Sequence, residues 1–282
     1  MPHPHFTDLR SPPIKHFKNL LLVIVTALAP TLFTVPAAAQ NAPAIGIVVM
    51  HGKGGSPTAR HMTPFVVGLE SKGLLVANLE MPWSGRRDYD TDVATAEAEV
   101  TAALNAMRSK GAKKVFVAGH SQGGVFASHY ASKYPVDGAI LIAPGGNVAN
   151  TTFRQQLGSA VDQARKMVAE GKGSERGTFM DYEGAKGTFP VHTTAAIYMT
   201  WFDPEGAMNQ EKSTKAIPPS VPVLYIGPTN DYPALQRIKQ SMFALLPANP
   251  QSKLYEPSSD HRGAPRASTD EIIRWTTEVA AR

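Results

Sequence analysis

A serine flanked by glycines carries the clearest chemical signal in the sequence. The motif Gly-His-Ser-Gln-Gly spans residues 119–123, directly after a strand-like run at 115–118 and directly before a helix-compatible run at 125–130. A serine at such a sharp strand-to-helix turn has a strained backbone, and its hydroxyl stands clear of the sheet. Glycines are needed on either side because side chains there would collide. The motif therefore predicts that Ser121 is a nucleophile.

A serine hydroxyl reacts at neutral pH only when a base removes its proton and an acid orients that base. His261 lies in a loop after the last predicted strand, where a base can reach the nucleophile of an open sheet. Asp231 follows another predicted strand through the turn at 227–230. The chain order Ser, Asp, His is the order expected for this geometry. We therefore predict Ser121, Asp231 and His261 as the catalytic residues.

Other residues compete for two of these roles. His192 is the rival base, and Asp203 is a distant alternative acid. The structural alternatives are a turn-forming role for Asp231 and a surface position for His261. If His261 is the base, activity is expected to rise with pH as the imidazole loses its proton.

Acyl transfer also needs hydrogen-bond donors for the oxyanion that forms when the carbonyl is attacked. The backbone N–H of Gln122, at the start of the predicted helix, is one candidate. The glycine-rich loop at 51–57 follows the first predicted strand, and we assign the second donor to the N–H of Lys53, with Gly54 as the alternative. This loop lacks the spacing of a phosphate-binding loop, so the sequence does not favour nucleotide binding.

The positions of these residues depend on a regular alternation of strands and helices. Short runs rich in Val, Ile and Leu alternate with amphipathic stretches, which indicates a mostly parallel sheet covered by helices on both faces. The predicted strands are 45–50, 74–79, 115–118, 139–143, 223–226 and 253–256, and helical spacing is clearest at 92–110 and 268–281.

The segment 145–220 departs from this alternation. It contains no convincing strand, but a helix is predicted at 153–170, and we interpret the segment as an insertion over one end of the sheet. Its aromatic residues, together with one in the turn after the second strand, are candidates for a substrate pocket: Trp83, Tyr198, Trp201 and Phe202. The alternative is that these side chains only pack the insertion.

The first 39 residues have the features of a secretory signal. Basic residues precede an apolar run at 20–33, and three alanines at 37–39 provide a cleavage pattern before Gln40. A membrane anchor is the alternative, but the run is shorter than the roughly twenty residues that a span requires, and Pro30 interrupts it. We therefore expect a signal peptide at 1–39, a single domain at 40–282, and a secreted or periplasmic protein.

Composition excludes several classes of protein. With 43% hydrophobic and 18% charged residues, the chain is neither disordered nor fibrous. The absence of cysteine excludes a disulfide framework and a thiol nucleophile. The basic residues form no stripe interleaved with aromatics, so a nucleic-acid partner is not expected. The mechanism outlined above requires no cofactor, and no residues cluster at metal-ligand spacing.

Taken together, the loop His-Gly-x-Gly-Gly at 51–55, the elbow at 119–123 and the later Asp231 and His261 resemble the α/β-hydrolase superfamily. The similarity covers nearly all of residues 40–282. It implies an α/β fold with a sheet of about eight strands, a Ser-His-Asp triad at Ser121, His261 and Asp231, and a helical lid matching the insertion. One departure is that Asp231 lies four residues after Gly227, whereas three is common in the family.

The resemblance gives an expected function. Serine at the elbow argues against the dehalogenase-like branch, which uses aspartate there. We expect a serine hydrolase that cleaves a small-molecule carboxylic ester through an acyl-enzyme on Ser121. A peptidase, an amidase or a thioesterase could use the same triad, and a non-catalytic binding protein could keep the fold.

Overall fold

The structure is a computed structural model that describes residues 44–184 and 186–282. The signal peptide predicted at residues 1–39 lies outside the described residues. Within the described ranges, no helix is both long enough and apolar enough to cross a membrane.

A parallel sheet forms the centre of the described chain. Its strands are β1 (Ile45–Met50), β2 (Leu75–Leu79), β3 (Lys114–His120), β4 (Gly138–Ile142), β7 (Val223–Ile226) and β8 (Lys253–Tyr255), in the spatial order β2-β1-β3-β4-β7-β8. Every neighbouring pair is parallel. The six predicted strands agree with these elements to within two residues at each end, and the predicted fold class is confirmed.

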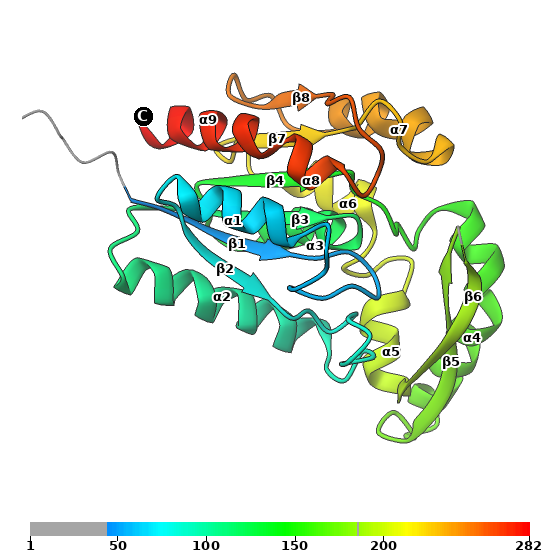
Figure 1. Cartoon of the computed structure of the whole chain (residues 1–282). Coiled ribbons are helices and arrows are strands. Elements are labelled where there is room, and N and C mark those ends of the chain that lie inside the picture. The colour runs from blue at the N-terminus through cyan, green and yellow to red at the C-terminus, as the bar shows by residue number, and fades with distance from the viewer. Residues whose placement is uncertain (1–43, 185) are drawn as a thin grey trace, which may run out of the picture. The chain divides into compact units, whose positions relative to one another are not determined.

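Helices cover both faces of the sheet, as Figure 1 shows. One face carries α1 (Thr63–Ser71), α8 (Ala264–Ala267) and α9 (Thr269–Ala280), and the other carries α2 (Val93–Ser109), α3 (Gln122–Lys133) and α7 (Pro233–Ala244). Alternate residues of each strand supply the two cores. In β3, Val115 and Val117 pack toward α2 and α3, whereas Phe116 and Ala118 pack toward α1 and α9. Two buried faces explain why the strands are apolar throughout.

The order of the strands predicts a ligand crevice at the carboxyl ends of β1 and β3. From β1 the chain moves outward to β2, then returns to the other side of β1 as β3 and continues in the opposite direction. In open α/β sheets, ligands bind at such a reversal, beyond the carboxyl ends of the strands. The loops after β1 and β3 are therefore the ones expected to carry the chemistry.

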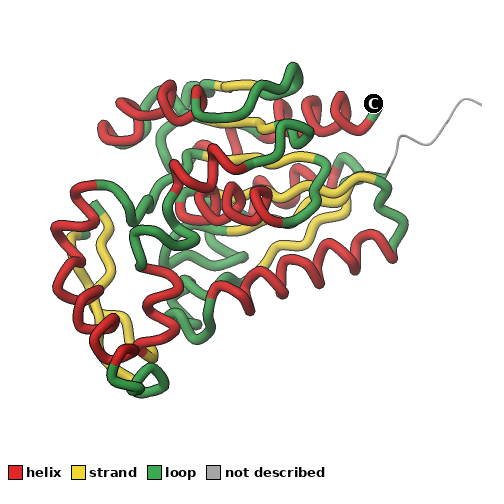
Figure 2. Tube along the Cα trace, turned by 180° about the vertical axis from the view of Figure 1, so that it is seen from behind, coloured by secondary structure: helices red, strands yellow, loops and turns green. Residues whose placement is uncertain are grey.

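Residues 145–220, which we call the cap, lie between β4 and β7. They contain α4 (Thr151–Ala169), β5 (Arg176–Glu183), β6 (Gly187–Thr194), α5 (Ala195–Phe202) and α6 (Gln210–Ala216). Figure 1 shows β5, β6 and α4 beyond the arrowhead ends of the parallel strands. Figure 2, which views the molecule from behind, shows the same hairpin with α4 running along it. The contacts between α4 and β5 agree with this arrangement.

The hairpin corrects the expectation that 145–220 holds no strand. β5 and β6 pair in antiparallel fashion from Arg176↔Thr194 to Glu183↔Gly187. Asp181 and Pro190 hide the alternating pattern, because a buried acid and a proline are both unusual in strands. Proline is tolerated here because each strand of a two-stranded hairpin has a free edge. The cap is thus mixed rather than only helical, and the main sheet has six strands among the described residues instead of about eight.

Candidate active site

The elbow after β3 has the strained geometry that its sequence predicts. Ser121 has φ 55° and ψ −118°, in the left-handed half of backbone space, which non-glycine residues rarely adopt. A Cβ on Gly119 would lie 1.9 Å from the carbonyl oxygen of Gly123, and one on Gly123 would lie 2.4 Å from the carbonyl oxygen of Met50. Only glycine fits at these two positions, so the turn can present Ser121 between β3 and α3.

The loops after β7 and β8 bring the predicted acid and base together. The parallel pairing of these strands continues past their ends, because Gly227 N–H donates to Tyr255 at 2.9 Å and Asn230 N–H donates to Ser259 at 3.0 Å. A further parallel bridge joins Asn230 to Asp260. The two loops therefore run side by side, and the fourth residue after Gly227 reaches His261.

His261 and Asp231 form a short, buried hydrogen bond. His261 Nδ1 lies 2.7 Å from Asp231 Oδ1, and their side chains are 9% and 3% exposed. Because an ionised carboxylate only accepts hydrogen bonds, Nδ1 carries the proton. With Nδ1 as the donor to Asp231, Nε2 is the ring nitrogen left to act as a base. The aspartate thus orients His261 as the base of a serine triad requires.

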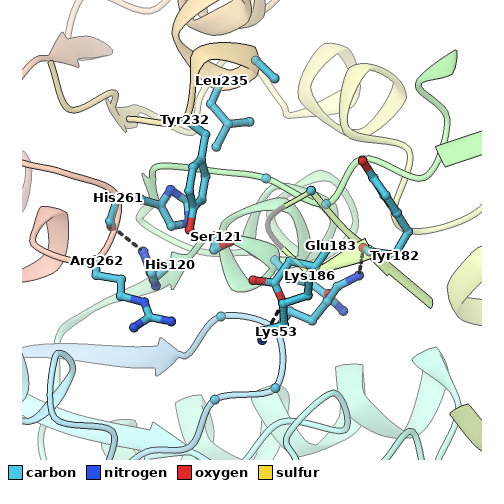
Figure 3. Close-up of a pocket in the computed structure, with 18 of the residues that line it drawn as sticks. Lys53, His120, Ser121, Tyr182, Glu183, Lys186, Tyr232, Leu235, His261 and Arg262 are labelled. Atoms are coloured by element: carbon cyan, nitrogen blue, oxygen red, sulfur yellow. Dashed lines mark hydrogen bonds and ion pairs between the residues drawn. The ribbon is translucent and has the colours of Figure 1, made fainter. Parts of the chain in front are cut away.

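Ser121 and His261 line the same cavity, which has a volume of about 630 Å³. Figure 3 shows Ser121 between His261 and Tyr232 on one side and Lys53 on the other. Its wall includes the apolar and aromatic side chains of Tyr232, Leu235, Phe153 and Tyr182. Charged residues also line it, namely Glu183 and Lys186 of the cap and Arg262 next to His261, so the Ser121 hydroxyl faces a mixed apolar and polar space.

The two predicted oxyanion donors border this cavity as well. Neither Lys53 N–H nor Gln122 N–H donates to a protein acceptor among the described residues. Gly54 N–H, the alternative donor, instead donates to the carbonyl oxygen of Trp83 at 2.9 Å. A Cβ on Gly52 would lie 3.1 Å from Ser121 Cβ, which shows how closely this loop approaches the elbow. Lys53 is thus better placed than Gly54 to supply the second donor.

His120 is a site residue that sequence reasoning missed. Its buried Nε2–H donates to the carbonyl oxygen of His261 at 2.9 Å, and its ring lies 4.8 Å from the His261 ring. Burial, together with the neighbouring His261, lowers the pKa of His120 well below its ordinary value. The His61 ring also packs against His120, with ring centroids 5.4 Å apart. Although these histidines cluster, no group of three metal-ligating side chains among the described residues is arranged to hold a metal ion.

The four aromatic residues predicted to bind substrate belong to the core instead. Trp83, Tyr198, Trp201 and Phe202 are each at most 2% exposed and do not line the cavity. Their rings pack on one another and on Phe126 of α3, with Tyr198 stacked on Phe202 at 4.3 Å. They join the cap to the main domain, which agrees with the packing alternative. The cavity wall is formed by other residues, including Tyr232 and Leu235.

The rival catalytic residues lie away from the cavity. His192 is exposed on β6, where its Nδ1 lies 3.1 Å from Thr178 Oγ1, and Asp203 follows the end of α5. Neither lines the cavity that contains Ser121. The structure thus brings Ser121, Asp231, His261, Gln122 and Lys53 to one end of the sheet.

The features described so far are a parallel sheet, an elbow serine, a buried His-Asp pair and a cap between β4 and β7. Together they define the class of the α/β-hydrolases, and a comparison with models of known protein families leads to the same class. The model of the alpha/beta hydrolase family matches residues 47–274. The chain belongs to this family.

Solved structures with the same fold show little sequence identity to the chain. A thermostable carboxyl esterase from Bacillus coagulans is 16% identical, with a TM-score of 0.60 over 84% of this chain and 91% of its own. Est1E from Butyrivibrio proteoclasticus, solved with ferulic acid, is 16% identical, with a TM-score of 0.57 over 86% and 92%. A monoacylglycerol lipase from Paleococcus ferrophilus is 19% identical, with a TM-score of 0.56 over 83% and 94%. A comparison with curated protein sequences gives no match.

Proposed function

We propose that the protein is a serine hydrolase that cleaves carboxylic esters through an acyl-enzyme on Ser121. The observation that carries this proposal is the buried hydrogen bond between His261 and Asp231, on the wall of the cavity that also contains the strained Ser121. The carboxylate of Asp231 orients the His261 imidazole within this cavity. Such an oriented base is what a serine nucleophile needs.

The proposed reaction proceeds in two halves. His261 Nε2 takes the proton of Ser121 as Oγ attacks the ester carbonyl, and the N–H groups of Lys53 and Gln122 donate to the oxyanion. The imidazolium then protonates the leaving alkoxide, and the carbonyl of the acyl-enzyme forms again. In the second half, His261 removes a proton from water, hydroxide attacks the acyl carbon, and Ser121 leaves with the proton from His261.

An ester is favoured over an amide as the substrate. The structures that share the fold and are described above include an esterase and a lipase, which supports esters as the class to test first. The cavity combines apolar groups near α7 with polar groups of the cap, as a small ester requires. Export of the protein, based on the pattern of residues 1–39, is part of the same proposal.

The test compares the wild type with Ser121→Ala on p-nitrophenyl esters of increasing chain length. We expect the variant to keep its circular dichroism spectrum and to lose activity by at least about 10⁴-fold, because no other group can form the acyl-enzyme. A matched p-nitroanilide measures amide cleavage, and a thioester measures the thioesterase alternative. Ester hydrolysis retained by Ser121→Ala would contradict the proposal. Folded wild type inactive on every ester would support a non-catalytic binding protein.

A further inference from the structure

A chain of buried polar side chains joins the cap to the two loops that carry the proposed oxyanion donors. Lys53 Nζ contacts the Asp181 carboxylate and donates to the carbonyl oxygen of Tyr182 at 3.0 Å. The Tyr89 hydroxyl donates to the other oxygen of Asp181 at 2.9 Å and accepts a hydrogen bond from Gln122 Nε2 at 3.1 Å. One cap carboxylate is therefore linked to both Lys53 and Gln122.

This network is shielded from water. The side chains of Lys53 and Asp181 are 9% and 0% exposed, and the Phe153 ring centroid lies 5.1 Å from Lys53 Nζ. Burial, reinforced by the Asp181 carboxylate, raises the pKa of Tyr89 well above its ordinary value, so its hydroxyl keeps the proton that it donates. In such surroundings a charge without its partner is costly, so the pair resists separation.

Lys53 lies in a loop whose flanking peptides are held by backbone hydrogen bonds. Lys53 stands between Gly52 and Gly54, and backbone hydrogen bonds hold its neighbours: Gly54 N–H donates to Trp83, and Gly55 N–H donates to Gly52. The peptide N–H of Lys53 itself has no protein partner among the described residues. The side chain of Lys53 is fixed to β5 and so adds a contact between the cap and the residue whose peptide N–H has no partner in the described part of the chain.

The cap also holds the other end of the network in a strained conformation. Asp88 and Tyr89 have φ values of 44° and 55°, which are unfavourable for side chains of this size. Thr193 Oγ1 donates to the Tyr89 carbonyl oxygen at 2.7 Å, and His192 N–H donates to Asp88 Oδ2 at 3.2 Å. Strain of this kind persists only where the surroundings impose it, and it gathers at functional sites.

We propose that Asp181 is a positioning residue for the oxyanion hole: by holding the Lys53 side chain, it fixes the Lys53 peptide N–H that donates to the developing oxyanion. The inference rests on the proposed serine-ester chemistry. It makes the cap a working part of the active site, since β5 of the cap hairpin supplies the group that fixes a donor. Asp181 touches no substrate and acts only through Lys53 and Tyr89.

The test is a double-mutant cycle of Asp181→Asn and Lys53→Met, in which the second variant keeps the peptide N–H and most of the side-chain length. We expect each single variant to lower kcat by about 10- to 100-fold, approaching the loss of one oxyanion donor, with KM changed by less than about twofold. The double variant should be no slower than either single one, because all three break the same link. The double variant contains neither the Lys53 ammonium nor the Asp181 carboxylate, so it leaves no buried charge unpaired. It therefore remains informative if a single variant folds poorly.

A second readout separates positioning from stability. A trifluoromethyl ketone adds reversibly to a serine Oγ and forms a tetrahedral oxyanion that needs the same donors. Its inhibition constant should rise in each variant by the factor by which kcat/KM falls. The control is Thr178→Val, which removes an exposed hydrogen bond from the same strand and should change neither constant.

The outcomes distinguish this inference from the proposed function. If the wild type is an esterase dependent on Ser121 and the folded variants keep its kcat and inhibition constant, Asp181 is only structural and the inference is overturned. If the variants lower the melting temperature alone, the same conclusion follows. If the wild type neither hydrolyses esters nor binds the ketone, the proposed function has failed instead.

Discussion

His120 joins the elbow to the loop that carries the proposed base. It precedes Ser121 in the chain, and its Nε2–H donates to the carbonyl oxygen of His261. Because the acceptor is a carbonyl, Nε2 carries a proton, while Nδ1 is buried without a partner among the described residues. Burial lowers the pKa of His120 and so favours the neutral ring with Nδ1 unprotonated. Protonation of His120 would place a charge beside His261 in a buried site, so the folded state resists it.

This resistance predicts how stability depends on pH. The pKa of His120 is lower in the folded protein than in the unfolded chain, so the unfolded chain binds the proton first as pH falls. The contribution of His120 is therefore fully present above its unfolded pKa of about 6.5 and is lost as pH falls from there toward the folded pKa. Burial lowers the pKa of His51, His61 and His129 as well, so they act in the same direction.

We expect His120→Gln, which keeps a donor for the His261 carbonyl, to flatten this dependence. The slope of unfolding free energy against pH between 7 and 5, from urea denaturation, should decrease by up to about 1.4 kcal/mol per pH unit, the effect of one proton. The control is His192→Gln, which removes an exposed histidine. An identical slope in wild type and His120→Gln would show that His120 does not resist protonation.

At the scale of elements, the elbow depends on the close approach of β3 and α3. A Cβ on Gly119 would collide with the backbone of Gly123 at the start of α3, and a Cβ on Gly123 would collide with the backbone of Met50 at the end of β1, so neither position accepts a side chain. The sequence of α3 (residues 122–133) does not by itself require glycine at its start. The requirement comes from the sharp turn between β3 and α3. A glycine elsewhere provides the comparison, because a Cβ on Gly158 of α4 would meet no atom within 4 Å.

Gly119 and Gly158 should respond in opposite ways to substitution by alanine. Gly119→Ala should lower the unfolding free energy by about 3 kcal/mol and remove activity, because the backbone of the elbow must shift to admit the methyl group. Gly158→Ala should raise it by about 0.5–1 kcal/mol, since alanine favours the helix, and should leave activity unchanged. Chemical denaturation and ester hydrolysis measure both effects. A tolerated Gly119→Ala variant with normal activity would contradict the elbow geometry.

Sequence predicted the elements of the sheet and the cap helix α4, but not the hairpin of the cap, for identifiable reasons. The strands of the sheet are buried on both faces, so their apolar runs stand out, and Asp231 and His261 follow from where β7 and β8 end. The hairpin is different because Asp181 is a charged residue at a buried position, paired with Lys53 from 128 positions earlier in the chain. A contact so distant in sequence leaves no local pattern.

The aromatic residues show the same limit for the site. Trp201 and Phe202 lie on the apolar face of a helix in the cap. The sequence pattern of such a face is the same whether a substrate or another helix packs on it. The structure places α3 there. Tyr232 and Leu235 line the cavity because α7 begins beside the Asp231 loop, a fact of tertiary packing that the spacing of the residues does not encode.

For the whole molecule, the main feature is that the cap shares a core with the sheet. Buried residues of α4, β5 and α5 belong to the same apolar cluster as those of α2, α3 and β3. Together with the buried Lys53–Asp181 pair, this packing makes the cavity a joint product of cap and sheet. The described residues 44–184 and 186–282 thus assemble one site from segments that span most of their length.

The most direct measurement of the central claim is covalent labelling by a fluorophosphonate, with the modified residue located by peptide mass spectrometry. An ordinary serine does not react, so labelling reports a hydroxyl activated by its neighbours. We predict that wild-type protein is modified at Ser121 alone and that His261→Ala reduces the rate of labelling by at least about 100-fold. Folded wild-type protein that is not labelled, or that is labelled equally fast without His261, would contradict the account.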